Sequence, residues 1–202
     1  MSTLWAGPVS LAVAKKTATG EITLVQCTGD GSPTCGEKAA GFSGGPFTAL
    51  CAFSAGGSFL KRRPDLLAQA QVVHLCDATY TTTNGAQEAP FAEYAARAAR
   101  GECCFIASAS AFANKNHPTG EQTLRMIQKM AGLDSDHVGD AHFFFRGFDV
   151  PHAGHATDLA PQLWAQFAVP FLGGSHAPSS GEGSDSLPFS QSPASPRRRG
   201  SC

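Results

Sequence analysis

The sequence has few charged residues, and this scarcity argues against several classes of protein. Asp, Glu, Lys and Arg make up 15% of the 202 residues, whereas hydrophobic residues make up 42%. This balance favours a buried core over a solvated, disordered chain. The formal net charge is −1, so the overall field gives no reason to expect nucleic acid or a membrane surface as a partner. No apolar run reaches the length of a bilayer-spanning helix.

The sequence also lacks a regular cysteine framework and a complete signal peptide. Its seven cysteines are an odd number without regular spacing. Four of them lie inside apolar runs, where cysteine acts as a small hydrophobe: Cys51, Cys76, Cys103 and Cys104. We interpret these as reduced core residues, which favours a cytoplasmic protein. The N-terminus has an apolar stretch followed by "AVA" but no positive n-region, so secretion is the alternative.

What the sequence does contain, between residues 48 and 172, is an alternation of apolar runs with helical patterns. The runs "TALCAF", "QVVHLCD", "ECCFIASAS" and "AHFFFRGF" are typical of strands buried on both faces. The segments between and after them are expected to be helices, at residues 56–70 (in two pieces split by Pro64), 89–101, 120–133 and 155–172. This order predicts an α/β fold with a mostly parallel sheet flanked by helices.

The two ends of the chain are expected to differ from this core. Residues 1–47 are predicted to be an irregular segment with one or two strands, at "EITLVQC" and, as a candidate, "SLAVAKK". No helix is expected there, so the helical layer should be thin. Residues 173–202 are rich in Ser, Pro and Gly and bury too little surface to offset chain entropy, which predicts a disordered tail.

Polar side chains follow several of the predicted strands. Ser54, Asp77, the "SASAF" segment and the "DVPHAGHATD" loop each come at or just after the end of an apolar run. Because right-handed crossovers bring the carboxyl ends of parallel strands to one edge of the sheet, these side chains are expected to meet in one crevice.

Two serines lie between small residues, as a nucleophile on a sharp strand-to-helix turn requires. Ser43, in "GFSGG", matches the G-x-S-x-G pattern literally, whereas Ser54, in "AFSAG", has Ala52 at the first glycine position. Only Ser54 follows a predicted strand and precedes a helical segment. Pro46 follows Ser43 and would disrupt such a helix. We therefore expect Ser54 to be the nucleophile, with Ser43 as the alternative.

A serine nucleophile needs a base and an acid that orients the base. Asp77 comes at the end of the next predicted strand; a cap on a nearby turn is its alternative role. His155 and His152 lie in a glycine-containing loop after the last predicted strand. We expect His155, just after Gly154, to be the base, with His152 as the alternative. The order Ser, Asp, His is that of α/β-hydrolases.

Several ordered segments are similar to motifs of the α/β-hydrolase superfamily. They are "AFSAGGS", "VVHLCDATY", "PFAEYAARAARGECCFIASAS", "TGEQTLRMIQKMAGL" and "FFFRGFDVPHAGHATDL". Over about residues 48–170 the chain resembles a group of uncharacterised bacterial members with an "FSAG" elbow. The resemblance implies Ser54 as nucleophile, Asp77 as acid and His155 as base.

The resemblance also implies an oxyanion hole, for which the Ala55 amide is one donor. Superfamily members have a strand ending in "HG" before the elbow, and "LVQCTGDG" is the nearest equivalent here, with Gly29 for the second donor. About two dozen residues separate that stretch from Ser54, so the N-terminal part is expected to be shortened.

These observations predict a serine hydrolase that cleaves a small-molecule ester or a related acyl bond, without a metal or organic cofactor. Two alternatives belong to other classes. One is a catalytically inactive, hydrolase-like fragment or binding module, which the short N-terminal part favours. The other is a metal-dependent hydrolase that uses His152, His155 and Asp158, although their spacing lacks the H-E-x-x-H pattern.

Overall fold

A sheet of six parallel strands forms the centre of the protein. The computed structural model describes residues 1–18, 20–27, 33–79, 88–111, 120–134 and 142–173. In spatial order the strands are β2 (Glu21–Val25), β1 (Ser2–Ala6), β3 (Ala49–Phe53), β4 (Val72–Cys76), β5 (Cys104–Ser110) and β6 (Phe143–Phe148). All neighbouring strands pair in parallel. The predicted α/β class is therefore confirmed.

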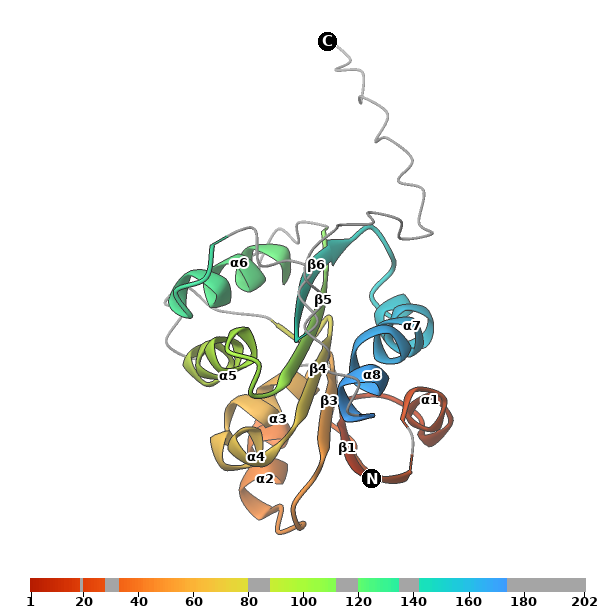
Figure 1. Cartoon of the computed structure of the whole chain (residues 1–202). Coiled ribbons are helices and arrows are strands. Elements are labelled where there is room, and N and C mark those ends of the chain that lie inside the picture. Colours follow the sequence, from red (N-terminus) through yellow and green to blue (C-terminus); the bar gives the residue numbers. More distant parts are fainter. Residues whose placement is uncertain (19, 28–32, 80–87, 112–119, 135–141, 174–202) are drawn as a thin grey trace, which may run out of the picture.

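Helices cover both faces of this sheet (Figure 1). One face carries α2 (Pro33–Gly41), α3 (Gly56–Lys61), α4 (Pro64–Gln69), α5 (Ala89–Ala99) and α6 (Gly120–Met130). The other face carries α1 (Leu11–Thr17) and a C-terminal helical region of η2 (His155–Leu159), α7 (Ala160–Leu163), η3 (Trp164–Ala168) and α8 (Val169–Leu172). The sheet thus separates two hydrophobic cores.

The elements predicted between residues 48 and 172 form at the expected places. All five residues of β3 and of β4 are buried, which explains why these strands read as continuous apolar runs. Pro64 begins α4 and separates it from α3. Pro90 lies in the first turn of α5, where its missing N–H costs no helical hydrogen bond.

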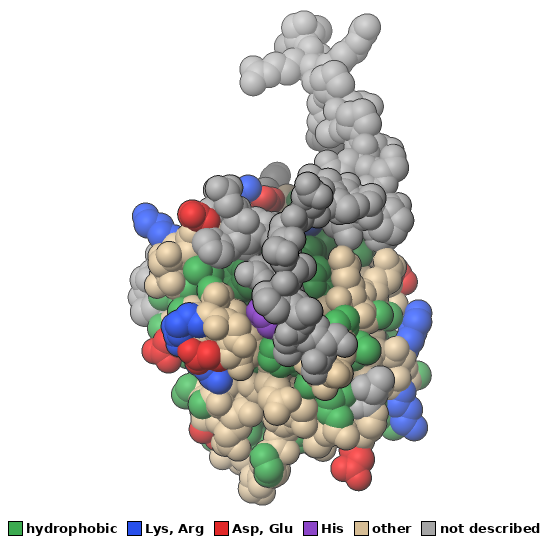
Figure 2. All heavy atoms as spheres, viewed as in Figure 1, with side chains coloured by type: hydrophobic (Ala, Val, Ile, Leu, Met, Phe, Trp, Pro, Cys, Tyr) green, Lys and Arg blue, Asp and Glu red, His purple; other side chains and the backbone are tan. Residues whose placement is uncertain are grey.

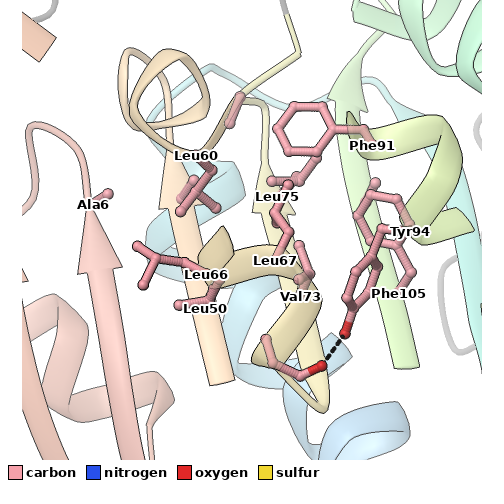
Figure 3. Packing of buried hydrophobic residues seen from close by; sticks show 14 of the residues in the cluster. Ala6, Leu50, Leu60, Leu66, Leu67, Val73, Leu75, Phe91, Tyr94 and Phe105 are labelled. Atoms are coloured by element: carbon pink, nitrogen blue, oxygen red, sulfur yellow. Dashed lines mark hydrogen bonds between the residues drawn. The ribbon is translucent and has the colours of Figure 1, made fainter. Parts of the chain in front are cut away.

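Aromatic and leucine side chains fill the core beneath α3, α4 and α5 (Figure 3). Phe105 of β5 meets Tyr94 and Phe145 edge-on, with ring centroids 5.2 and 4.8 Å apart. The buried Tyr94 hydroxyl donates to the Ala70 carbonyl at 3.1 Å, so its polar end is satisfied at the end of α4 (Figure 3). This packing joins β5 and β6 to α5 and to the end of α4.

The N-terminal segment is more regular than the sequence indicated. "SLAVAKK" is not a strand: residues 11–17 form α1, and Ser10 caps it by accepting a hydrogen bond from the Val13 amide at 3.3 Å. A second helix, α2, precedes β3. The expectation of a segment without helices was therefore wrong. Ala and Lys favour helix, and the buried face of α1 is small, with only Ala14 and Thr17 buried.

The first strand, β1, lies where the sequence predicted no strand. The predicted "EITLVQC" strand forms as β2 and lies at the edge of the sheet. The strand beside β3 is β1, whose Thr3 pairs with Ala49 in the parallel register. The chain therefore builds strand, helix, strand and helix before it reaches β3. The predicted tail at 173–202 lies outside the described residues except for Gly173.

The four cysteines expected in the core are buried and unpaired: Cys51, Cys76, Cys103 and Cys104. None of the described helices combines the length and apolar character needed to span a membrane. On the face drawn in Figure 2, positive and negative side chains are both scattered around the margin.

Candidate active site

Ser54 occupies a sharp turn between β3 and α3. Its φ is 53°, in the left-handed region, which costs a non-glycine residue roughly 1–2 kcal/mol. Because this conformation is unfavourable by itself, contacts with neighbouring strands have to stabilise it. The Ser54 amide donates to the carbonyl of Cys76, at the end of β4, at 3.4 Å. The predicted strand–turn–helix context of Ser54 is present.

Glycines let the turn sit directly against the neighbouring strands. A Cβ on Gly56 would lie 2.0 Å from the Ala6 carbonyl oxygen, and a Cβ on Gly57 would lie 1.8 Å from that of Ala78. Gly7 follows β1 with φ at 140°, and a Cβ there would lie 2.3 Å from the Phe53 oxygen. The turn is therefore wedged between the ends of β1 and β4.

Asp77 adopts a left-handed conformation at the end of β4, with φ at 43°. Its side chain is almost fully buried and turns toward β5. The Ser110 amide donates to Oδ1 at 2.8 Å, and the Ser110 hydroxyl donates to Oδ2 at 2.5 Å. The carboxylate is thus held by the neighbouring strand rather than by a cap on its own turn.

The electrostatics at Asp77 favour the charged carboxylate. Burial acts to raise the pKa of Asp77, but the hydrogen bonds from His152 and Ser110 outweigh burial and hold that pKa below its ordinary value. A carboxylate that keeps its charge while buried can orient and stabilise a cationic partner.

His152 is the partner of Asp77. Its Nδ1 lies 2.7 Å from Asp77 Oδ2. Its ring stacks on that of Phe53, the residue before Ser54, with centroids 4.6 Å apart and planes 28° apart. The His152 side chain is 45% exposed, so its outer edge faces solvent beside the elbow. The contact with Asp77 engages Nδ1 of the His152 ring.

His155 lies elsewhere, although the sequence favoured it as the base. It is fully buried, and its Nδ1 lies 2.9 Å from the hydroxyl oxygen of Ser108 on β5. Burial lowers the pKa of His155, His152 lowers it further and Asp77 opposes the shift. Of the two candidate histidines, the structure therefore brings the alternative, His152, to the Asp77 carboxylate.

The other predicted site residues fall apart from this group. Ser43 follows α2 in an exposed stretch rather than at the end of a strand. Gly29 lies outside the described residues, and the strand before it, β2, is separated from β3 by β1. The Ala55 amide, in contrast, directly follows Ser54 and precedes α3.

Gly7 takes the place beside the elbow that the sequence assigned to Gly29. Its amide donates to the Val25 carbonyl at 3.0 Å, and Pro8 has no N–H to offer. Neither Gly7 nor Pro8 therefore offers a backbone N–H to a ligand. The run "STLWA" before "GP" is the signal that could have identified this strand end.

Two hollows formed by described residues are not lined by Ser54, Asp77 or His152. Within the described ranges, no group of three or more His, Cys, Asp or Glu side chains could hold a metal ion. A hollow of about 480 Å³ lies between α6 and β6 and is lined by charged residues such as Arg125 and Arg146. A second hollow, of about 410 Å³, is lined by Pro8 and Val9, which directly follow Gly7, among other residues.

No protein-family model, curated protein or solved structure matches the chain. The likeness to α/β-hydrolases therefore rests on the sequence motifs. What the structure adds to it is an α/β fold with a parallel sheet flanked by helices.

Proposed function

We propose that the protein is a serine hydrolase in which Ser54 is the nucleophile, His152 the base and Asp77 the acid that orients the base. The observation that carries the proposal is the 2.7 Å contact between Asp77 Oδ2 and His152 Nδ1 beside the left-handed Ser54. Strained backbone conformations of non-glycine residues cluster at functional sites, and Ser54 has such a conformation. The three residues also follow the chain order of α/β-hydrolases.

In this mechanism Asp77 fixes the tautomer of His152 that carries its proton on Nδ1. Nε2 then accepts the proton of the Ser54 hydroxyl as Ser54 Oγ bonds to the acyl carbon of the substrate. The protonated His152 returns that proton to the leaving alkoxide, and an acyl-enzyme remains. Water attacks the acyl carbon, gives its proton to Nε2, and the proton then returns to Ser54 as the acid product leaves.

The developing negative charge on the acyl oxygen requires hydrogen-bond donors. The Ala55 amide directly follows the nucleophile, and backbone hydrogen bonds within the described residues do not engage it. We assign the second donor to the loop after β1, at the Val9 amide, because Gly7 is committed to Val25 and Pro8 has no N–H. Losing one such donor typically costs about 100- to 1,000-fold in rate.

The substrate class is a small ester or related acyl compound. The hollow of about 410 Å³ adjoins the proposed Val9 donor only, and its lining also includes Lys38 and Cys27. The Lys38 ammonium donates to the Gln26 carbonyl at the rim of this hollow, which places a positive charge there. This positive charge favours an ester that carries an acidic group.

Acyl-enzyme formation provides the test. Wild-type protein mixed with p-nitrophenyl acetate should release a burst of p-nitrophenol stoichiometric with the protein and then turn over slowly. Ser54→Ala should abolish the burst, and Ser43→Ala, the matched control, should retain it. A cooperative thermal transition without any burst in the wild type would favour the inactive scaffold instead. A burst that survives Ser54→Ala would contradict the assignment of the nucleophile.

A further inference from the structure

We infer that Ser108 and His155 are positioning residues that set the contact between Asp77 and His152. The geometric claim concerns only these four residues, while its catalytic consequence rests on the function proposed above. The inference gives a role to His155, a fully buried histidine that the mechanism leaves unused.

His155 fixes the loop that carries His152. The two histidines are three residues apart, in a turn closed by hydrogen bonds from the Gly154 amide to the Pro151 carbonyl at 2.8 Å and from the His155 amide to the His152 carbonyl at 3.3 Å. His155 begins η2, and its ring points into the protein while that of His152 faces solvent. Whatever holds the His155 ring therefore also limits where His152 can lie.

Ser108 is what holds the His155 ring. Its hydroxyl oxygen lies 2.9 Å from His155 Nδ1. Phe148, at the end of β6, meets the same ring edge-on with centroids 6.4 Å apart. The neutral form of His155 suits this buried site, because burial lowers its pKa. The ring is thus pinned between β5 and β6.

The same Ser108 also holds the backbone of Asp77. Its carbonyl accepts a hydrogen bond from the Asp77 amide at 2.8 Å, which continues the pairing of Cys76 with Ser108 in the β4–β5 register. Two residues further along β5, Ser110 binds the Asp77 carboxylate. One rigid strand therefore anchors both halves of the Asp77–His152 contact, one through a carbonyl and the other through a hydroxyl.

A simple core role for His155 would leave the Asp77–His152 geometry unchanged when Ser108 loses its hydroxyl. A positioning role predicts that this geometry changes. The test compares crystal structures and ester hydrolysis of the wild type with those of Ser108→Ala, His155→Leu and His155→Asn. Thr3→Val is the matched control, since Thr3 is a buried residue of β1 whose hydroxyl has no hydrogen-bond partner among the described residues. Asparagine keeps a side-chain amide, which can donate or accept a hydrogen bond, close to the place of Nδ1 and should rescue the effect of leucine.

In Ser108→Ala and His155→Leu, we expect the distance from Asp77 Oδ2 to His152 Nδ1 to exceed hydrogen-bonding range, about 3.5 Å. We expect kcat to fall about 100-fold, as for a small misplacement of a catalytic group, with KM little changed. Thr3→Val and His155→Asn should keep both the contact and most of the rate. If Ser108→Ala does not fold, the comparison of His155→Leu with His155→Asn decides the question.

An unchanged Asp77–His152 contact in folded Ser108→Ala and His155→Leu would overturn the inference. The crystallographic distance separates this failure from that of the proposed function. Loss of the contact in a protein whose wild type hydrolyses no ester supports the positioning role and contradicts the catalytic proposal. Retention of the contact in the variants of an enzyme that hydrolyses esters contradicts the positioning role and supports the catalytic proposal.

Discussion

Asp77 and His152 are 75 residues apart in the sequence, yet Asp77 Oδ2 and His152 Nδ1 lie 2.7 Å from each other. The contact forms because parallel strands deliver their carboxyl ends to one edge of the sheet. Asp77 enters it from the end of β4, and His152 enters it from the loop after β6. Each of the predictions below tests a part of the structure that supports this contact or the elbow beside it.

Replacing Asp77 should make stability less dependent on acid pH. The pKa of Asp77 lies below its ordinary value of 3.8 in the folded protein, so its charge stabilises the fold above about pH 3.8, and this contribution is lost as the pH falls further. We expect Asp77→Asn to cost about 2 kcal/mol at pH 7, typical of a hydrogen bond to a charged group, and less at pH 3. Urea unfolding at the two pH values measures this. An equal loss of stability at pH 7 and pH 3 would contradict the assignment of a charged Asp77 carboxylate.

His74 should limit the acid stability of the protein. It is fully buried on β4 beside the Trp164 ring, and neither of its ring nitrogens has a hydrogen-bond partner among the described residues. Burial, followed by the electrostatic effect of the nearby His155, lowers the pKa of His74 from 6.5 to about 3. Between those two pH values the unfolded chain binds a proton that the folded protein does not, so stability falls as the pH falls.

We therefore expect His74→Leu to flatten the pH dependence of stability. Each unit of pKa shift corresponds to 1.36 kcal/mol, so the shift of His74 from 6.5 to about 3 corresponds to about 5 kcal/mol of stability, most of which is lost between those two pH values. The free energies of unfolding of wild type and His74→Leu, measured with urea at pH 7, 5 and 4, should converge or cross as the pH falls. A constant difference between the two free energies at all three pH values would show that His74 is not buried in its neutral form.

Gly57 should tolerate no side chain. A Cβ would lie 1.8 Å from the Ala78 carbonyl oxygen, and backbone at the end of β4 cannot move without disturbing Asp77. We expect Gly57→Ala to destabilise the fold by about 2 kcal/mol or more, as overpacking does. Gly45→Ala is the control, because nothing lies within 4 Å of a Cβ there. Thermal melts of the two variants give the comparison, and a Gly57→Ala protein as stable as Gly45→Ala would refute the close packing of the turn.

The part of the fold between residues 48 and 172 could be predicted from sequence because its strands are buried on both faces. Such strands give unbroken apolar runs, and helices of amphipathic pattern lie between them. The N-terminal part offers weaker signals. In this part α1 buries little surface, and "AVAKK" lacks a clear apolar stripe. Only the pairing of β1 with β3 shows which strand lies beside the elbow.

The positions of Ser54 and Asp77 at neighbouring strand ends followed from the sequence, but the choice between two histidines did not. His152 and His155 lie in the same loop, three residues apart, and both follow the last strand. Their different surroundings depend on where η2 begins, since that start turns His155 inward and leaves His152 at the surface. Ser108 and Ser110 were recognised as lying at the strand end, but their partners depend on the β4–β5 register.

Covalent labelling with a fluorophosphonate tests the central proposal most directly, because the probe reacts only with an activated serine. Wild-type protein should be labelled at Ser54, as located by peptide mass spectrometry. Ser54→Ala should not be labelled, His152→Ala should be labelled far more slowly, and Ser43→Ala should match the wild type. Absence of labelling in folded wild-type protein, or equal labelling of Ser54→Ala, would contradict the proposal.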